Sequence, residues 1–158
     1  MYRQAEIKVT ILENIELKFE GKLAIDNRWV IMSELIPWSE FESEYPKNFS
    51  ELGIGAPAKS FRIALGSLII KERLGVSDRE TVEQIRENPY LQYFLGIADY
   101  SDKAPFEASM LVHFRQRIGE EIISRINRRM VENKSERIGE KNQEKKSKET
   151  KSRKIKEG

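Results

Sequence analysis

The 158-residue sequence contains no cysteine and a single histidine, His113, and these two shortages exclude several kinds of chemistry. Without cysteine there is no disulfide framework and no thiolate metal site, and one histidine cannot supply the usual imidazole zinc sites. The sequence has no run of 18 uncharged apolar residues, and its charged N-terminus lacks the apolar stretch of a signal peptide. We therefore expect a cytoplasmic protein without a metal or cofactor, in which any catalysis would depend on carboxylates.

The net charge is small, but its distribution along the chain is uneven. The formal net charge is +2, yet residues 132–158 hold ten Lys or Arg against six Glu. This segment offers only Ile138 and Ile155 as large apolar side chains, too few to offset the entropy of ordering it. We therefore expect one folded domain at 1–131 and a disordered, charged tail or linker at 132–158. A solvated linker and a tail that holds phosphates without reading sequence are both compatible with this composition.

The N-terminal third combines a strand pattern with helix signals. Residues 5–20 alternate apolar and polar positions, which predicts a short hairpin or extended arm. Asn27 is suited to cap a short helix that the next proline ends. Ser39 and Glu42 then have the spacing of a capping box, which predicts a second short helix at about 39–45.

The middle of the chain has the pattern of two helices joined by a tight turn. Residues 53–60 contain two glycines and a proline and are expected to form a loop. The segment 59–74 is apolar on more than one side, so its helix is expected in the centre of the domain. Gly75 is suited to end this helix, and Ser77 with Glu80 has capping-box spacing for the next one. The unit resembles a helix-turn-helix.

Two further helices and a loop complete the predicted domain. The helix after Ser77 should break at Asn88, since a proline follows, and another short helix should end near Gly96. Residues 97–106 are polar and predict a loop, and apolar side chains at spacings of three and four predict a long helix over 107–131. The sequence thus predicts a mainly α fold: a multi-helix bundle with a helix-turn-helix-like unit, a short N-terminal extended arm and a disordered basic C-terminal tail.

The long predicted helix carries the most basic surface of the folded part. On a helical wheel of about 100° per residue, His113 and Arg117 point away from the apolar stripe. The candidate nucleic-acid-binding residues are His113, Arg117, Arg125, Arg128 and Arg129. Glu120 and Glu121 lie three and four residues from Arg117, so an ordinary solvated face with local ion pairs is the favoured interpretation, and phosphate binding is the alternative. A catalytic or metal-binding role for His113 is disfavoured, because no second ligand or oriented nucleophile is visible.

Arg115 falls on the apolar stripe of the same helix, close to Phe114, and is expected to point inward. A buried guanidinium needs hydrogen-bond acceptors, so we expect a partner carboxylate or several backbone carbonyls. The main interpretation is a structural latch between helices, and a direct contact to nucleic acid is the alternative.

Two other candidate sites are weak. The helix after Ser77 has the position of a recognition helix, but Glu80, Glu83 and Glu87 line one side of it, and that face would repel phosphates. Asp99 and Asp102 form a conceivable metal pair, yet both are ordinary turn residues without a third acidic neighbour.

Three blocks of the sequence resemble one family. They are NRWVIMSELIPW (27–38), GAPAKSFRIALGSLIIKERLGVSDRETVEQIRENPYLQYFLG (55–96) and PFEASMLVHFRQRIG (105–119). Their order and separation resemble the N-terminal domain of bacterial insertion-sequence transposases of the DDE type, the InsH-like group, across residues 1–131. The resemblance implies a helical region that recognises transposon ends or helps to assemble the complex. In similar proteins it precedes a ribonuclease-H-like domain that binds two divalent metal ions.

The resemblance transfers no catalytic residue to this sequence. In similar proteins the first catalytic aspartate follows a charged linker in a DAT-like motif, and this sequence ends within such a linker. We therefore expect a truncated transposase that binds transposon-end DNA or joins an assembly and has no catalytic activity of its own. The alternatives are a protein interaction module that self-associates or pairs with full-length transposase, and possible inhibition by that pairing. A self-contained nuclease is a third, disfavoured hypothesis.

Overall fold

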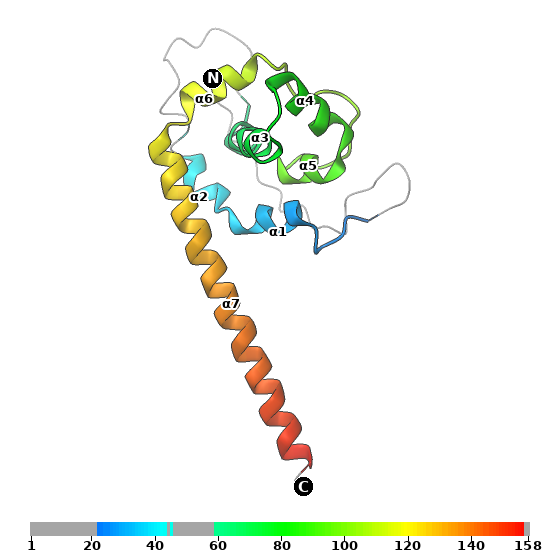
Figure 1. The fold of residues 1–158 in the computed structure, drawn as a ribbon, viewed down its shortest axis with the longest axis vertical. Coiled ribbons are helices and arrows are strands. Elements are labelled where there is room, and N and C mark those ends of the chain that lie inside the picture. Colours follow the sequence, from blue (N-terminus) through cyan, green and yellow to red (C-terminus); the bar gives the residue numbers. More distant parts are fainter. Residues whose placement is uncertain (1–21, 44, 46–58, 157–158) are drawn as a thin grey trace.

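The computed structural model describes residues 22–43, 45 and 59–156, and it describes them as helices joined by loops (Figure 1). The helices are α1 (Arg28–Leu35), α2 (Trp38–Glu42), α3 (Phe61–Leu74), α4 (Asp78–Glu87), α5 (Pro89–Phe94), α6 (Met110–Arg117) and α7 (Glu120–Lys156). No strand occurs in these ranges, so the mainly α fold is confirmed. The predicted arm at 5–20 and most of the predicted loop at 53–60 lie outside the described residues. None of the described helices has the length and apolarity needed to cross a membrane.

The start of α1 follows the sequence prediction, but the start of α2 does not. The Asn27 side chain accepts a hydrogen bond from the Trp29 backbone N–H at 2.9 Å, as an N-cap should. The predicted capping box of Ser39 and Glu42 is wrong, because α2 already begins at Trp38, which is buried against the core. Ser39 therefore lies inside the helix, and the Glu42 side chain is buried and directed to the Phe61 N–H of α3 instead of the start of α2.

Helix α3 occupies the centre of the body, where α2, α4 and α6 pack against it (Figure 1). The Ser60 hydroxyl accepts from the Ile63 N–H at 3.3 Å and begins the helix. Gly75 ends it in the left-handed conformation, with φ of 65°. The Ser77 hydroxyl accepts from the Glu80 N–H at 3.1 Å and starts α4. The predicted helix, turn and helix are confirmed.

The core is built around the aromatic side chain of Phe94 on α5. Trp29 and Trp38 both meet it edge to face, with ring centroids 5.3 and 5.5 Å away. The predicted start of α5 is also observed, since the Asn88 side chain accepts from the Tyr90 N–H with a proline in the first turn. This aromatic cluster joins α1 and α2 to α5.

The single helix predicted over 107–131 is wrong, because the chain bends after Arg117. Ile118 has extended backbone angles, φ −102° and ψ 97°, and separates α6 from α7. Glycine disfavours helix, and Glu120 and Glu121 favour a helix start, since carboxylates stabilise the first turn. Apolar residues recur every three or four positions on both sides of Gly119, because α6 and α7 each bury one face in the same core.

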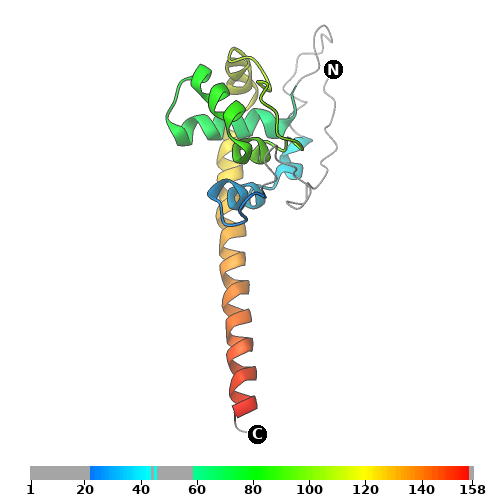
Figure 2. The same cartoon turned by 90° about the vertical axis from the view of Figure 1, so that its right-hand side faces the viewer.

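The disordered tail predicted for 132–158 is also wrong for residues 132–156, which continue α7 as a helix. Glu, Lys, Arg and Gln are good helix formers, and this propensity can sustain a helix even where little apolar surface is buried. The first half of α7 packs on the body, where the Asn133 side chain donates to the Leu35 carbonyl at 2.9 Å. The second half extends away from all other described helices in both views (Figure 2).

Candidate nucleic-acid interface

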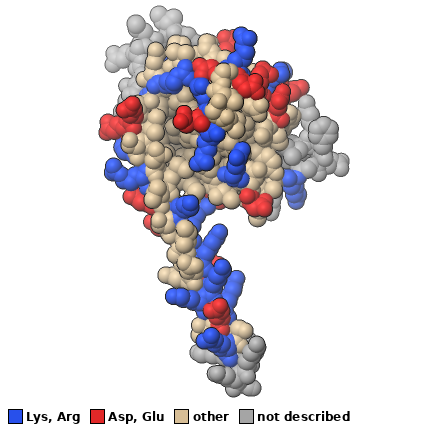
Figure 3. Space-filling view, in the orientation of Figure 1, with Lys and Arg blue, Asp and Glu red and all other residues tan. Residues whose placement is uncertain are grey.

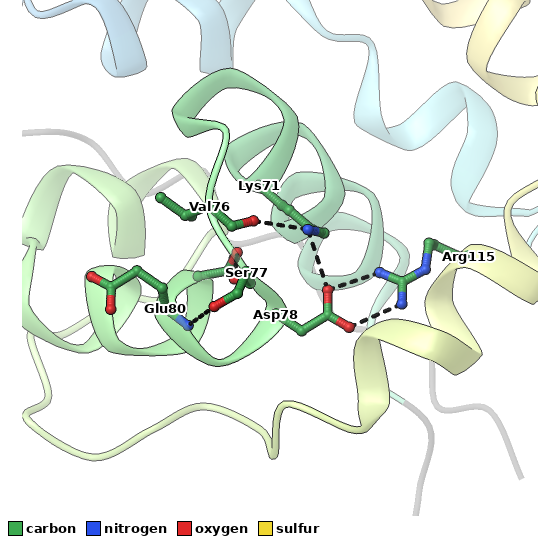
Figure 4. Close-up of polar contacts among 7 residues, drawn as sticks. Lys71, Val76, Ser77, Asp78, Glu80 and Arg115 are labelled. Carbon is green, nitrogen blue, oxygen red and sulfur yellow. Dashed lines mark hydrogen bonds and ion pairs between the residues drawn. The ribbon is translucent and has the colours of Figure 1, made fainter.

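Asp78 at the first turn of α4 connects three helices through its carboxylate (Figure 4). Arg115 of α6 donates to both carboxylate oxygens, at 3.0 and 2.9 Å. Lys71 of α3 lies 3.5 Å from the same carboxylate and donates to the Val76 carbonyl of the turn at 2.8 Å. The Arg115 guanidinium, followed by Lys71, holds the pKa of Asp78 below its usual range. The arrangement ties the helix-turn-helix unit to α6.

The carboxylate partner predicted for Arg115 is therefore found, and it is Asp78. The burial predicted for Arg115 is wrong. Its side chain is 42% exposed, because Asp78 meets it at the surface between α4 and α6. Phe114, the neighbouring residue, takes the core position and is fully buried. Of the predicted capping box, the Ser77 half is observed, because its hydroxyl accepts from the Glu80 N–H. The Glu80 carboxylate instead accepts from the Gln84 side chain at 2.7 Å.

Arg117 does not point outward as the helical wheel predicted. It is half-buried at the end of α6, where it interacts with Tyr45. Burial raises the pKa of Tyr45, and a hydrogen bond from Arg117 opposes that rise. Glu42 lies in the same region; burial raises its pKa, while a hydrogen bond from the Phe61 backbone N–H lowers it. Arg117 thus belongs to a polar cluster between α2, α3 and α6.

Two of the predicted DNA-contacting arginines also make contacts within the protein. The Arg125 guanidinium lies over the Phe41 ring, 5.1 Å from its centroid. Arg129 pairs with Glu40 of α2 at 3.1 Å and with Glu132 of α7 at 3.0 Å. These contacts secure the start of α7 to α2.

The five predicted residues consequently do not form one face. His113 and Arg117 belong to α6, whereas Arg125, Arg128 and Arg129 belong to α7, and the bend at Ile118 separates the two. A single helical wheel drawn through both helices therefore gives the wrong relative directions for side chains of α6 and α7. Of the five, only His113 and Arg128 are exposed and form no hydrogen bond or ion pair with another described residue.

The acidic candidates give no metal site within the described ranges. No group of three or more His, Asp or Glu side chains there could hold a metal ion, and this includes Asp99 and Asp102. On α4, Glu80 and Glu87 are exposed and Glu83 pairs with Arg86 at 2.7 Å, so its outer face is acidic. Phosphates would be repelled by that face.

Sequence reasoning missed Arg62, which connects α3 to α1 and α5. Its guanidinium donates to the Phe94 and Tyr93 carbonyls and to the Ser33 hydroxyl, at 2.9, 3.0 and 2.8 Å. It also lies over the Trp38 ring at 4.9 Å, and burial lowers its pKa to about 10. The sequence did contain a signal for this role. Arg62 lies at the N-terminal end of a nearly all-apolar helix, and an arginine that is buried there must find hydrogen-bond acceptors.

An apolar groove of about 500 Å³ lies between α1, α3 and α7. Leu65, Leu68 and Ile69 line it from α3, and Ile123, Ile126 and Met130 line it from α7. Ile123 remains 39% exposed, and two further apolar side chains of α7, Val131 and Ile138, are 66% and 52% exposed. The charged residues Lys71, Glu72, Arg73 and Arg115 also line the groove.

The projecting half of α7 is the most basic element of the described structure. Space-filling atoms of Lys and Arg gather along it, with fewer acidic ones between them (Figure 3). Between residues 141 and 153 it carries Lys141, Lys145, Lys146, Lys148, Lys151 and Arg153, against Glu144 and Glu149. All eight side chains are exposed.

Comparison with known families identifies the body. Residues 17–117 match the family described as "Transposase domain (DUF772)". The chain belongs to this transposase family. The match ends at Arg117, the last residue of α6, so the transposase domain comprises the body up to the bend and α7 follows it.

The transposase domain is also similar to a curated protein named "Uncharacterized protein ORF8 in nfe locus" from Rhizobium meliloti. The two are 32% identical over 103 residues, which cover 65% of this chain and 49% of that protein. The chain thus spans about half the length of the curated relative it matches. No solved structure matches it. Membership of the family supports a general role in transposition.

Proposed function

We propose that this protein is the DNA-binding and assembly portion of an insertion-sequence transposase, and that it acts in DNA transposition by holding transposon-end DNA. One observation carries the proposal: an exposed, basic helix, α7, projects from a transposase domain. Lysine and arginine side chains that neutralise phosphates supply most of the affinity of proteins for DNA. The arginine face predicted from the sequence contributes less, because most of its members contact the body.

Catalysis lies outside the proposed function. Strand transfer by two metal ions needs several carboxylates within coordination distance of each other. Among the described residues no group of three or more His, Asp or Glu side chains could hold a metal ion, and the proposal assigns no catalytic role to any of them. The test is to incubate the purified 158-residue protein with transposon-end DNA and magnesium. Cleavage or joining that co-purifies with the protein, and that a contaminating nuclease does not explain, would contradict this part of the proposal.

DNA binding is tested by fluorescence anisotropy with a labelled duplex of about 30 base pairs, titrated at several salt concentrations. We expect binding that weakens steeply with salt, because each neutralised phosphate contributes about 0.9 to the slope of log K against log salt. A transposon-end duplex and a shuffled duplex of the same composition separate specific from general binding. No measurable binding at 50 mM salt would contradict the proposal.

A second candidate function, pairing with another transposase copy, is favoured by the apolar groove between α3 and α7. Contiguous exposed apolar surface of this kind is typical of a protein interaction site. Outside the groove, α7 also exposes the apolar side chains of Val131 and Ile138. The protein would then act through assembly, and an excess of it would inhibit an active transposase.

Salt dependence separates the two functions. Apolar docking buries surface without releasing counterions, so its affinity should change little between 50 and 300 mM salt. Sedimentation equilibrium of the protein alone measures self-association over this range. The substitution Leu68→Glu, which places a charge in the groove, should abolish association while leaving DNA binding intact. A monomer at all accessible concentrations would argue against the second candidate as self-association.

A further inference from the structure

Four exposed lysines of α7 fall on one side of the helix: Lys134, Lys141, Lys145 and Lys148, which we name the lysine stripe. They are spaced by seven, four and three residues. At about 100° per residue, this spacing places all four within an arc of about 60°. With a rise of 1.5 Å per residue, the stripe is about 21 Å long.

The stripe is free of acidic side chains. Glu132, Glu136 and Glu140 lie on the opposite half of the helix, and Glu144 and Glu149 lie on the flanks, by the same angular spacing. None of the four lysines forms an ion pair with a described residue. Arg137, which borders the stripe, is by contrast paired with Glu34 of α1 at 3.0 Å. The stripe therefore presents positive charge directly to solvent.

A second helix of the same kind does not fit this face. Lys134, Lys141 and Lys148 repeat every seven residues, so a parallel copy of α7 would oppose lysine with lysine along the seam. Like charges at such positions are destabilising. The stripe instead suits a polyanion.

Among polyanions, the residues favour the backbone of duplex DNA. Residues 120–158 contain no Phe, Tyr or Trp, so the helix lacks the aromatic platforms on which single-stranded bases stack. The stripe consists of lysines, which act as point charges, and not of arginines, which read guanine edges in pairs of hydrogen bonds. An α-helix of 10–12 Å diameter also fits along the major groove, which is about 12 Å wide.

We propose that the lysine stripe is a duplex-DNA-binding surface that contacts phosphates and does not read base sequence. This inference rests on the proposed DNA-binding function and assigns it to particular residues of α7. The predicted arginine face is not required for it. The contacts position DNA along the projecting helix, and any recognition of a specific end sequence resides elsewhere.

The test compares two triple variants of the full chain that remove the same charge from the same segment of α7. The stripe variant is Lys141→Gln, Lys145→Gln and Lys148→Gln, and the control is Lys146→Gln, Lys151→Gln and Arg153→Gln. Glutamine preserves helix propensity, which far-ultraviolet circular dichroism verifies. Binding to a duplex of unrelated sequence and to the matching single strand is measured from 50 to 200 mM salt.

We expect the stripe variant to bind the duplex at least about tenfold more weakly, with its salt slope reduced by about 2 to 3. The control should change affinity less than about threefold, since its side chains point elsewhere. Equal weakening in both variants would overturn the assignment to the stripe. Tighter binding to the single strand, or to RNA of the same sequence, would overturn the assignment to duplex DNA. Absence of binding by the unmodified protein would instead overturn the proposed function itself.

Discussion

The carboxylate of Asp78 accepts two parallel hydrogen bonds from Arg115, and this pair joins the first turn of α4 to α6. The geometry is that of a two-pronged arginine-carboxylate pair, which is stronger and more directional than a single contact. Lys71 adds a third cationic contact from α3, so one acidic side chain organises the outer surface of three helices.

Replacing Asp78 by Asn should lower the free energy of unfolding by about 0.5–1 kcal/mol, since both side chains are partly exposed and solvent screens them. The lowered pKa of Asp78 stabilises the fold above the unfolded pKa of about 3.9. This stability is lost as the pH falls through the lower folded pKa. Urea unfolding should therefore show a difference between wild type and Asp78→Asn at pH 7 that is smaller at pH 2.5. An undiminished difference at pH 2.5 would contradict this origin.

Glu42→Gln should raise the melting temperature at pH 7.5. The pKa of the buried Glu42 is raised above its ordinary value of 4.5, so its contribution is favourable at low pH and is lost as the pH rises through the folded pKa. Glutamine carries no charge, so the variant does not lose stability as the pH rises. Its side-chain oxygen can still accept a hydrogen bond from the Phe61 N–H. Thermal unfolding between pH 4.5 and 8 measures the effect, with the exposed Glu87→Gln as control. A melting temperature that falls with Glu42→Gln at pH 7.5 would show that the charge stabilises the fold.

Gly96→Ala should be more destabilising than Gly75→Ala. Both glycines have positive φ, 75° and 65°, which costs an alanine about 1–2 kcal/mol. A Cβ at Gly96 would also lie 2.9 Å from Cδ of Arg62, whereas one at Gly75 meets no atom within 4 Å. Displacing Arg62 weakens its hydrogen bonds to α1 and α5 and adds to the cost. Urea denaturation of the two variants gives the comparison, and equal losses would show that Arg62 adjusts freely.

Substitutions at Gly139 test whether the projecting half of α7 is helical in solution. Gly139 is exposed inside the helix and a Cβ there meets no atom within 4 Å. Gly139→Ala should therefore increase helicity, with a gain of about 0.8–1 kcal/mol, whereas Gly139→Pro should interrupt the helix. Circular dichroism at 222 nm measures both. Identical spectra for the two variants would indicate that this segment is not helical.

Local signals predicted much of the fold because their physics is local. A side chain that caps its own helix, as at Asn27 and Ser77, needs only two or three following residues. The left-handed turn at Gly75 likewise depends on the absence of a Cβ. Such features can be identified in a sequence without knowledge of distant contacts.

The errors arose where a local pattern was extended across a break. The helical wheel placed Arg117 outside although it lies only about 60° from the buried Phe114 in the same helix. Grouping Arg117 with Arg125, Arg128 and Arg129 assumed that α6 and α7 are one helix, and a single residue, Ile118, invalidates that grouping. The glycine and two glutamates that follow Ile118 are a stop and start signal that could have indicated the bend. Arg62 is different in kind, because its acceptors on α1 and α5 lie about thirty residues away and only the folded structure brings them together.

The tail was mispredicted because a shortage of apolar residues was equated with disorder. Apolar burial decides whether a segment joins a core, but helix propensity decides whether a segment rich in Glu, Lys and Arg remains helical without one. The lysine stripe becomes visible only once those residues are given a helical period. The stripe that we propose as the DNA contact thus lies outside the segment in which the sequence analysis placed its candidate residues.

The length of α7 sets the distance between the groove and the far end of the lysine stripe. From Ile126 in the groove to Lys148 is 22 residues, or about 33 Å of straight helix, which is close to one full turn of B-form duplex. A molecule seated in the groove would leave the far end of the helix unobstructed. The stripe therefore begins beside the groove, with Lys134 four residues after Met130, and ends about one duplex turn away from it.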